Sequence, residues 1–86
     1  MRKVQTGKVY RHFKGNYYYV QEVGLSSETK ERLVIYRALY DRSDSQVWIR
    51  PEKMFLEEVD KNRKDNLTGQ KYRFEIAEDL DAYYFK

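Results

Sequence analysis

The chain has 86 residues, of which 16% are aromatic, and its 17 basic and 14 acidic side chains give a net charge of +3. This length suits one domain and excludes two that fold independently. The absence of cysteine excludes disulfides, thiolate metal sites and thiol nucleophiles, and the single histidine, His12, excludes a His-rich metal site. No apolar run is long enough for a membrane span or a secretory signal. We therefore expect one soluble, cytoplasmic domain over residues 1–86, with no cofactor.

Short runs of β-branched and aromatic residues predict strands in the first half of the chain. The runs Val9 to Phe13 and Tyr17 to Val23 flank a Lys-Gly-Asn turn, which predicts a hairpin. The polar segment from Gly24 to Arg32 is expected to be a loop, because its Ser, Glu and Thr side chains bond to nearby backbone groups and compete with strand pairing. Leu33 to Tyr40 is the strongest predicted strand.

The second half continues with a strand that ends at Pro51, because proline lacks the N–H that a sheet requires and can open a helical turn. Alternation of Tyr72, Phe74 and Ile76 with charged residues predicts a half-buried closing strand. The elements expected are a strand at 47–50, a helical turn at 51–54, a strand at 55–59, a loop at 60–71, the closing strand at 72–76, and a tail at 77–86 with a short helix.

Five or six short strands with this aromatic density favour a mainly β fold. Each buried aromatic side chain contributes a large apolar area, which a small chain needs for its core. We expect a small, partly open SH3-like barrel with its core at 7–59, closed by the strand at 72–76.

Four segments are denser in specific chemistry than packing requires: Tyr-Arg-His-Phe-Lys-Gly-Asn at 10–16, Ser-Glu-Thr at 27–29, Tyr-Arg-Ala-Leu-Tyr at 36–40, and Trp-Ile-Arg-Pro at 48–51 followed by Met-Phe. Their order and spacing over residues 7–59 closely resemble the bacterial and phage family catalogued as domain of unknown function 1653. A weaker match covers 72–74. The resemblance brings no function, because the family is named for lacking one.

The same segments supply the groups of a polar binding site. Arginine recognises phosphate or carboxylate through two parallel hydrogen bonds, hydroxyls orient a ligand, and tyrosine offers a stacking face. We expect a non-catalytic module that binds a small, partly anionic, nucleotide-like ligand, for instance a phage protein that sequesters a host nucleotide signal. The candidate site comprises Arg11 or His12, Ser27, Glu28, Thr29, Tyr36 and Arg50.

A purely structural interpretation of these residues stays open. The hydroxyls at 27–29 can satisfy their own turn. If Trp48 is a core residue, Arg50 on the same strand face must reach the rim of the domain or pair with a carboxylate such as Glu28.

A rival hypothesis makes the protein a nucleic-acid or protein adaptor that uses an exposed face of the barrel. Tyr17 and Tyr19 share one strand face near the basic first strand, where they can stack on bases or form a cross-strand aromatic ladder. Catalysis is not expected, since no nucleophile or metal cluster accompanies His12 in the sequence. The aromatic tail could mediate self-association into a homo-oligomer. The alternative face comprises Lys8, Arg11, Lys14, Tyr17 and Tyr19.

Overall fold

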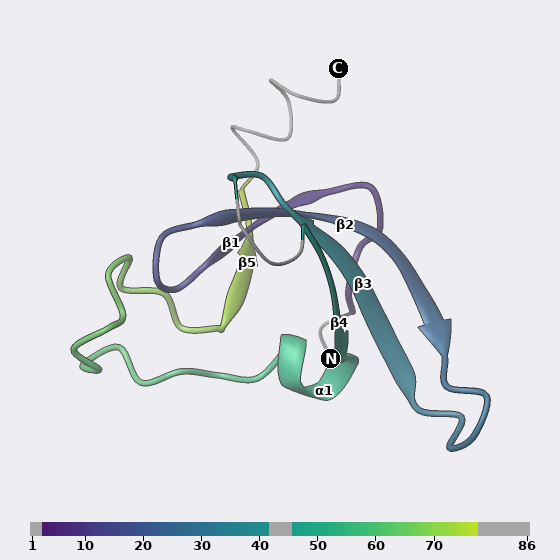
Figure 1. Ribbon diagram of the computed structural model, residues 1–86. Helices are drawn as coiled ribbons and strands as arrows, with labels where there is room; N and C mark the ends of the chain where they lie inside the picture. Colours follow the sequence, from purple (N-terminus) through teal and green to yellow (C-terminus); the bar gives the residue numbers. More distant parts are fainter. Residues whose placement is uncertain (1–2, 42–45, 78–86) are drawn as a thin grey trace.

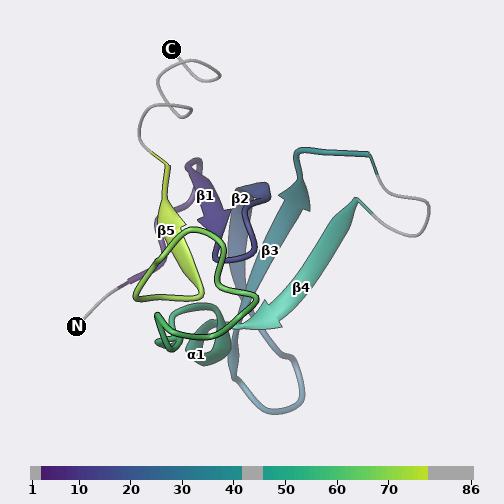
Figure 2. The ribbon, with the colours of Figure 1, turned by 90° about the vertical axis from the view of Figure 1, so that its left-hand side faces the viewer.

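The computed structural model describes residues 3–41 and 46–77, which form one antiparallel five-stranded sheet in the order β4-β3-β2-β1-β5 (Figures 1 and 2). The mainly β, partly open architecture expected from the sequence is confirmed. β4 and β5 end the sheet on opposite sides and do not pair with each other, so the sheet is open. The elements are β1 (Val9–His12), β2 (Tyr17–Leu25), β3 (Arg32–Ala38), β4 (Val47–Pro51), α1 (Glu52–Phe55) and β5 (Phe74–Ile76).

The central strand β2 is the longest and pairs with β1 on one side and β3 on the other. Its register with β3 shifts between Val20 and Glu22, where one extra residue is accommodated. Such a bulge bends its strand and increases the local twist. The bend helps the sheet to curl, as Figures 1 and 2 show.

The core lies on one face of this curled sheet, where α1 closes over it. Its buried cluster comprises Tyr10, Val20, Val34, Tyr36, Phe55 and Phe74. The rings of Phe55 and Phe74 stack in parallel with centroids 4.0 Å apart, and Tyr10 and Tyr36 meet Phe55 edge to face. Aromatic rings therefore join α1 to three strands, as a short chain with few aliphatic core residues requires.

The predicted strand at 55–59 is wrong. Phe55 is instead the last residue of α1, and the backbone N–H of Leu56 donates to the Glu52 carbonyl to complete the helical turn. The apolar residues of 55–59 also fit a strand, but only the helical turn places the Phe55 ring, which is fully buried, against Phe74. Farther along, Glu58 forms only an isolated bridge to Tyr72.

Other element boundaries differ by a few residues. β2 continues to Leu25, which shortens the loop expected after Val23, and β3 ends at Ala38 rather than at Tyr40. β5 begins at Phe74, two residues later than predicted. The expected C-terminal helix lies in residues 78–86, outside the described part of the chain.

The segment between α1 and β5 runs beside α1 and under the sheet edge formed by β1 and β5 (Figure 2). Asn66 organises it, because its side-chain amide donates to the carbonyls of Asp60 and Gln70 at 3.1 and 2.9 Å. The Leu67 N–H attaches the segment to the Phe13 carbonyl at 2.9 Å. None of the helices among the described residues is both long and apolar enough to cross a membrane.

Candidate functional site

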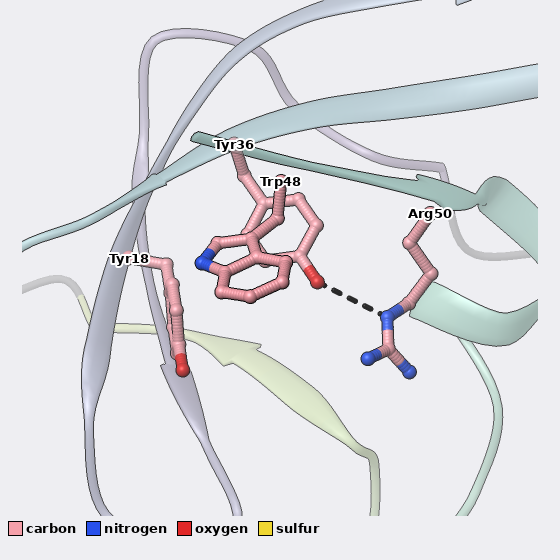
Figure 3. A pocket seen from close by; sticks show the side chains of 4 residues that line it. All are labelled: Tyr18, Tyr36, Trp48 and Arg50. Carbon is pink, nitrogen blue, oxygen red and sulfur yellow. Dashed lines mark hydrogen bonds between the residues drawn. The ribbon is translucent and has the colours of Figure 1, made fainter. Parts of the chain in front are cut away.

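A pocket of about 170 Å³ opens on the core face of the sheet, over β2, β3 and β4 (Figure 3). The strand register creates it: Tyr36 pairs directly with Trp48, while Arg50 is two residues farther along β4 on the same face. Tyr18 enters from β2, opposite Ala38. The pocket is thus lined by three aromatic side chains and one guanidinium: Tyr18, Tyr36, Trp48 and Arg50.

The guanidinium of Arg50 is held from one side only. Its Nε donates to the hydroxyl of Tyr36 at 3.1 Å, and its central carbon lies 5.9 Å from the centroid of the Phe74 ring. In Figure 3 the two terminal nitrogens make no hydrogen bond to the residues drawn. Across residues 3–41 and 46–77, no carboxylate pairs with Arg50. A half-buried guanidinium without a counter-charge is a suitable receptor for an anion.

The aromatic walls are rigidly connected. The hydroxyls of Tyr18 and Tyr40 are 2.7 Å apart, within hydrogen-bond distance, and the Tyr18 and Tyr36 rings meet edge to face with centroids 5.4 Å apart. Trp48 packs against the buried core while remaining partly accessible. The Tyr36 ring is buried, so Trp48 is the lining ring that a ligand could contact over part of its face.

His12 lies beside the pocket at the end of β1. Its ring packs edge to face against Phe74 at 4.9 Å and against Tyr18 at 6.2 Å between centroids. Burial, together with the positive charges of Arg73, Arg50 and Lys14, lowers the pKa of His12 from 6.5 to about 4. His12 is therefore neutral at pH 7.

The tautomer of His12 follows from one hydrogen bond. Its Nδ1 accepts from the backbone N–H of Lys14 at 3.1 Å, so the proton of the neutral ring is on Nε2. No described group accepts a hydrogen bond from that Nε2. In addition to the Arg50 guanidinium, the site thus has an uncharged hydrogen-bond donor, the Nε2–H group of His12.

Metal binding has no support in the described segments, which hold no cluster of three or more His, Asp and Glu side chains placed to bind an ion. The chemistry available at the pocket is recognition of an anion by donors and of a flat ring by aromatic walls.

Three of the residues predicted to form a site converge there. Tyr36 and Arg50 line the pocket, and His12 is adjacent through its contacts with Tyr18 and Phe74. Arg11 points to the opposite face of the sheet, because neighbouring residues of a strand alternate between faces. There its guanidinium carbon lies 5.2 Å from the centroid of the Tyr17 ring.

The Ser-Glu-Thr segment is not part of the pocket. Ser27, Glu28 and Thr29 lie in the turn between β2 and β3, at the hairpin tip that extends away from the sheet (Figure 1). The N–H groups of Glu28 and Thr29 donate to the hydroxyl of Ser26. This hydroxyl therefore stabilises the turn itself.

The ion pair considered between Arg50 and Glu28 does not form. Arg50 bonds to Tyr36, and the carboxylate that bridges the start of β3 to α1 is Glu52, whose two oxygens accept from Arg32 at 2.8 and 3.2 Å. The reason is the length of the hairpin: Pro51 is opposite Leu33, and the pairing of β2 with β3 continues one residue farther, to Leu25 and Arg32, before the turn that holds Glu28.

Tyr18 and Trp48 were missing from the predicted site, although both carried a signal. Period-two alternation places Trp48 with Arg50 and Tyr18 with Val20 on shared faces. Only the pairing of β2, β3 and β4 shows that these faces meet around one cavity.

The alternative nucleic-acid face is partly assembled on the outer side of the sheet. Tyr17 pairs with Arg11, and Tyr19 pairs with Arg37 on the neighbouring strand. Lys14 instead lies in the β1–β2 turn with its ammonium 3.8 Å from Asp65. Lys8 precedes β1 and accepts a hydrogen bond from the Val20 N–H through its carbonyl.

Comparison with known proteins gives a family and a solved relative. The model of the family described as "Protein of unknown function (DUF1653)" matches residues 8–76. The crystal structure of a DUF1653 protein from Bordetella bronchiseptica shares 31% sequence identity and a TM-score of 0.70, covering 86% of this chain and 87% of that chain. No curated protein matches the sequence significantly.

Proposed function

This chain belongs to the DUF1653 family, which has no assigned function, and we propose that it is a non-catalytic binding module for a small, partly anionic, nucleotide-like ligand. The observation that carries the proposal is the half-buried Arg50 guanidinium at an aromatic pocket, with no carboxylate partner among the described residues. Burying a charge costs free energy unless it is paired. A bound anion would supply the missing partner.

The sign of the ligand charge follows from comparing the attraction of a cation to the aromatic rings with its repulsion by Arg50. A pocket of two tyrosines and a tryptophan resembles the aromatic cages that bind quaternary ammonium groups, each ring contributing about 0.5–2 kcal/mol. Arg50 lines the same pocket, and two like charges about 4 Å apart repel by roughly 4 kcal/mol near a protein surface. Three rings together attract a cation by about 1.5–6 kcal/mol, so the repulsion offsets much of that attraction, whereas Arg50 attracts an anion; the pocket therefore favours an anion over a cation.

The biological role that we attach to this site is sequestration of a nucleotide signal. A binding domain can lower the concentration of a free ligand simply by holding it, without any chemical step. In a phage, such a protein would withhold a host nucleotide signal from its receptor.

A thermal-shift screen against nucleotides and cyclic nucleotides tests the binding proposal. A ligand at a hundredfold excess over its Kd should stabilise the protein by about 2.7 kcal/mol, which raises the melting temperature of a domain of this size by roughly 10 °C or more. Arg50→Ala should abolish the shift. No stabilisation by any compound of the panel would contradict the proposal.

Arg37→Ala is the matched control, since Arg37 is an exposed arginine on the opposite face of β3. It removes the same charge from the molecule without touching the pocket, so the thermal shift should persist. Equal losses in both variants would mean that net charge, and not the pocket, controls binding.

The outer face supports a second candidate, an adaptor for single-stranded nucleic acid. The specific observation is that Arg11 lies over the Tyr17 ring while Tyr19 occupies the next position on the same strand face. Paired stacking rings with adjacent cations suit successive bases and their phosphates. Gel-shift titrations with RNA and DNA test it, because counterion release makes such binding fall steeply with salt. No shift at low salt would eliminate it.

A further inference from the structure

We propose that the pocket binds one nucleotide, with its phosphate held between Arg50 and His12 and its base against Trp48, so that His12 is the second anion-binding residue of the site. This inference rests on the proposed function and adds to it the size of the ligand, its orientation and the role of His12.

The geometry places both donors against one ring. The Arg50 guanidinium carbon lies 5.9 Å from the centroid of Phe74, and the His12 ring lies 4.9 Å from the same centroid. The buried Phe74 is fixed by its parallel stack on Phe55. Both donors lie within 6 Å of the centre of one immobile ring, and the positive charge of Arg50 acts on His12, so we place a single phosphate between them.

The tautomer of His12 makes its free ring nitrogen a hydrogen-bond donor and not an acceptor. The Lys14 N–H occupies Nδ1, which leaves the proton on Nε2 with no described acceptor. A neutral donor of this kind adds a hydrogen bond to an anion without adding a charge that would have to be desolvated. The segment that resembles other family members at 10–16 thus carries a binding group whose orientation is set by its own turn.

The size of the pocket limits the ligand. Its volume of about 170 Å³ is below the roughly 300–1,000 Å³ of sites that enclose a drug-sized molecule. We place one base against Trp48 with its phosphate at the Arg50 end of β4, which leaves a second base outside the pocket. We therefore expect a mononucleotide and not a dinucleotide to make the full set of contacts.

The surroundings of His12 predict coupling between anion binding and proton uptake. The charged and titratable groups that face its ring are Lys14, Arg50, Arg73, Asp65 and Tyr18, and the three cations outweigh the single carboxylate. A phosphate bound beside the ring would offset these cations. An opposite charge at this range raises a histidine pKa by about 1–3.

Because the chain has a single histidine, NMR can follow His12 in the untagged, unmodified protein. The probe is guanosine 3′,5′-cyclic monophosphate, whose charge is constant between pH 5 and 8. We expect the free protein to show the Nε2–H tautomer and a low pKa, and the saturated protein to show a pKa higher by at least one. Binding should be about twofold tighter at pH 5 than at pH 7, and more so if the pKa rises by more than one.

His12→Asn provides the matching variant, because the asparagine oxygen can accept from the Lys14 N–H while its shorter side chain cannot reach the Nε2 position. The variant should bind the probe about tenfold more weakly at pH 7 and lose the pH dependence. If the probe binds in an Arg50-dependent manner but the pKa of His12 is unmoved, the role of His12 is refuted and the proposed function stands. If the probe and the other nucleotides fail to bind at all, both are refuted.

Discussion

At the scale of single residues, Arg50 differs from the other arginines that the structure describes near the core. Arg73 is paired with Glu57, and Arg32 with Glu52. Within residues 3–41 and 46–77, Arg50 has one hydrogen bond, to the Tyr36 hydroxyl, and it lines the pocket. Its contribution to stability should therefore be small, because a typical partly exposed hydrogen bond contributes only about 1 kcal/mol.

Arg50→Ala should lower the free energy of unfolding by about 1 kcal/mol or less while abolishing ligand binding. Urea denaturation of the wild-type and variant proteins measures the first effect, and the thermal-shift screen the second. A loss of roughly 3–5 kcal/mol would instead show that the Arg50 guanidinium is a structural group of the core, and it would remove Arg50 from the site.

The lowered pKa of His12 predicts a stability that depends on pH. The unfolded chain takes up a proton at His12 near pH 6.5, whereas the folded protein does so only near pH 4, so the unfolded state is favoured as the pH falls between these values. The loss should be on the order of 1 kcal/mol, since the half-exposed ring is partly screened by water. Unfolding free energies measured from pH 7 to 4.5 should decline in the wild-type protein.

His12→Asn separates this effect from the titration of carboxylates, which also weakens proteins at the acidic end of the range. The difference in unfolding free energy between the wild-type protein and the variant should become smaller as the pH falls from 7 to 4.5. A constant difference from pH 7 to 4.5 would show that the folded and unfolded states bind a proton at His12 equally well.

At the scale of elements, the β1–β2 hairpin sets the position of both His12 and Tyr18. Its turn depends on Gly15, which has a φ of 108° and donates its N–H to the His12 carbonyl at 2.8 Å. This backbone region disfavours side chains of L residues, so a glycine is required at this point. The turn therefore fixes the register that brings Tyr10 opposite Tyr18.

Gly15→Ala should destabilise the protein by about 1–2 kcal/mol, although an added methyl group would meet no atom within 4 Å. Gly24→Ala is the control, because its site in β2 is equally open and its φ is not in the left-handed region. It should be neutral or slightly stabilising, since glycine in a strand costs conformational entropy. Equal melting temperatures of the two variants would contradict the assigned strain.

At the scale of the whole molecule, the domain is small and depends on few core residues. Stabilities of about 0.05–0.15 kcal/mol per residue give a chain of this length a total of roughly 4–13 kcal/mol. The Phe55 ring joins α1 to β1, β3 and β5 through rings 4.0 to 5.4 Å away. One side chain thus carries a large share of the long-range packing.

Phe55→Ala should cost about 3–5 kcal/mol, enough to leave a substantial unfolded population at 37 °C. Circular dichroism during urea titration measures this loss. Leu67→Ala is the control, because Leu67 is 73% exposed and its truncation should change stability by no more than about 0.5 kcal/mol. If the Phe55 variant unfolded at the same urea concentration as this control, the helix α1 would not be part of the cooperative core.

How much of this could be predicted from the sequence is clearest at β4 and α1. Period-two alternation placed Trp48 and Arg50 on one face, and Pro51 marked the change from strand to helical turn, because both signals depend on neighbouring residues only. The local composition of residues 55–59, by contrast, misassigned Phe55 to a strand. Its helical conformation depends on burial against Phe74, a residue far along the chain.

The sequence by itself determined the mainly β fold, the hairpins and the family, since these follow from propensity, turn residues and local motifs. Only the tertiary structure decided which motif residues share a site. It brought His12 and Arg50 to the rings of Tyr18 and Phe74, and it carried Glu28 to the tip of a hairpin away from Arg50. The physical reason is that strand register and core packing act between residues distant in the chain, where no local pattern records them.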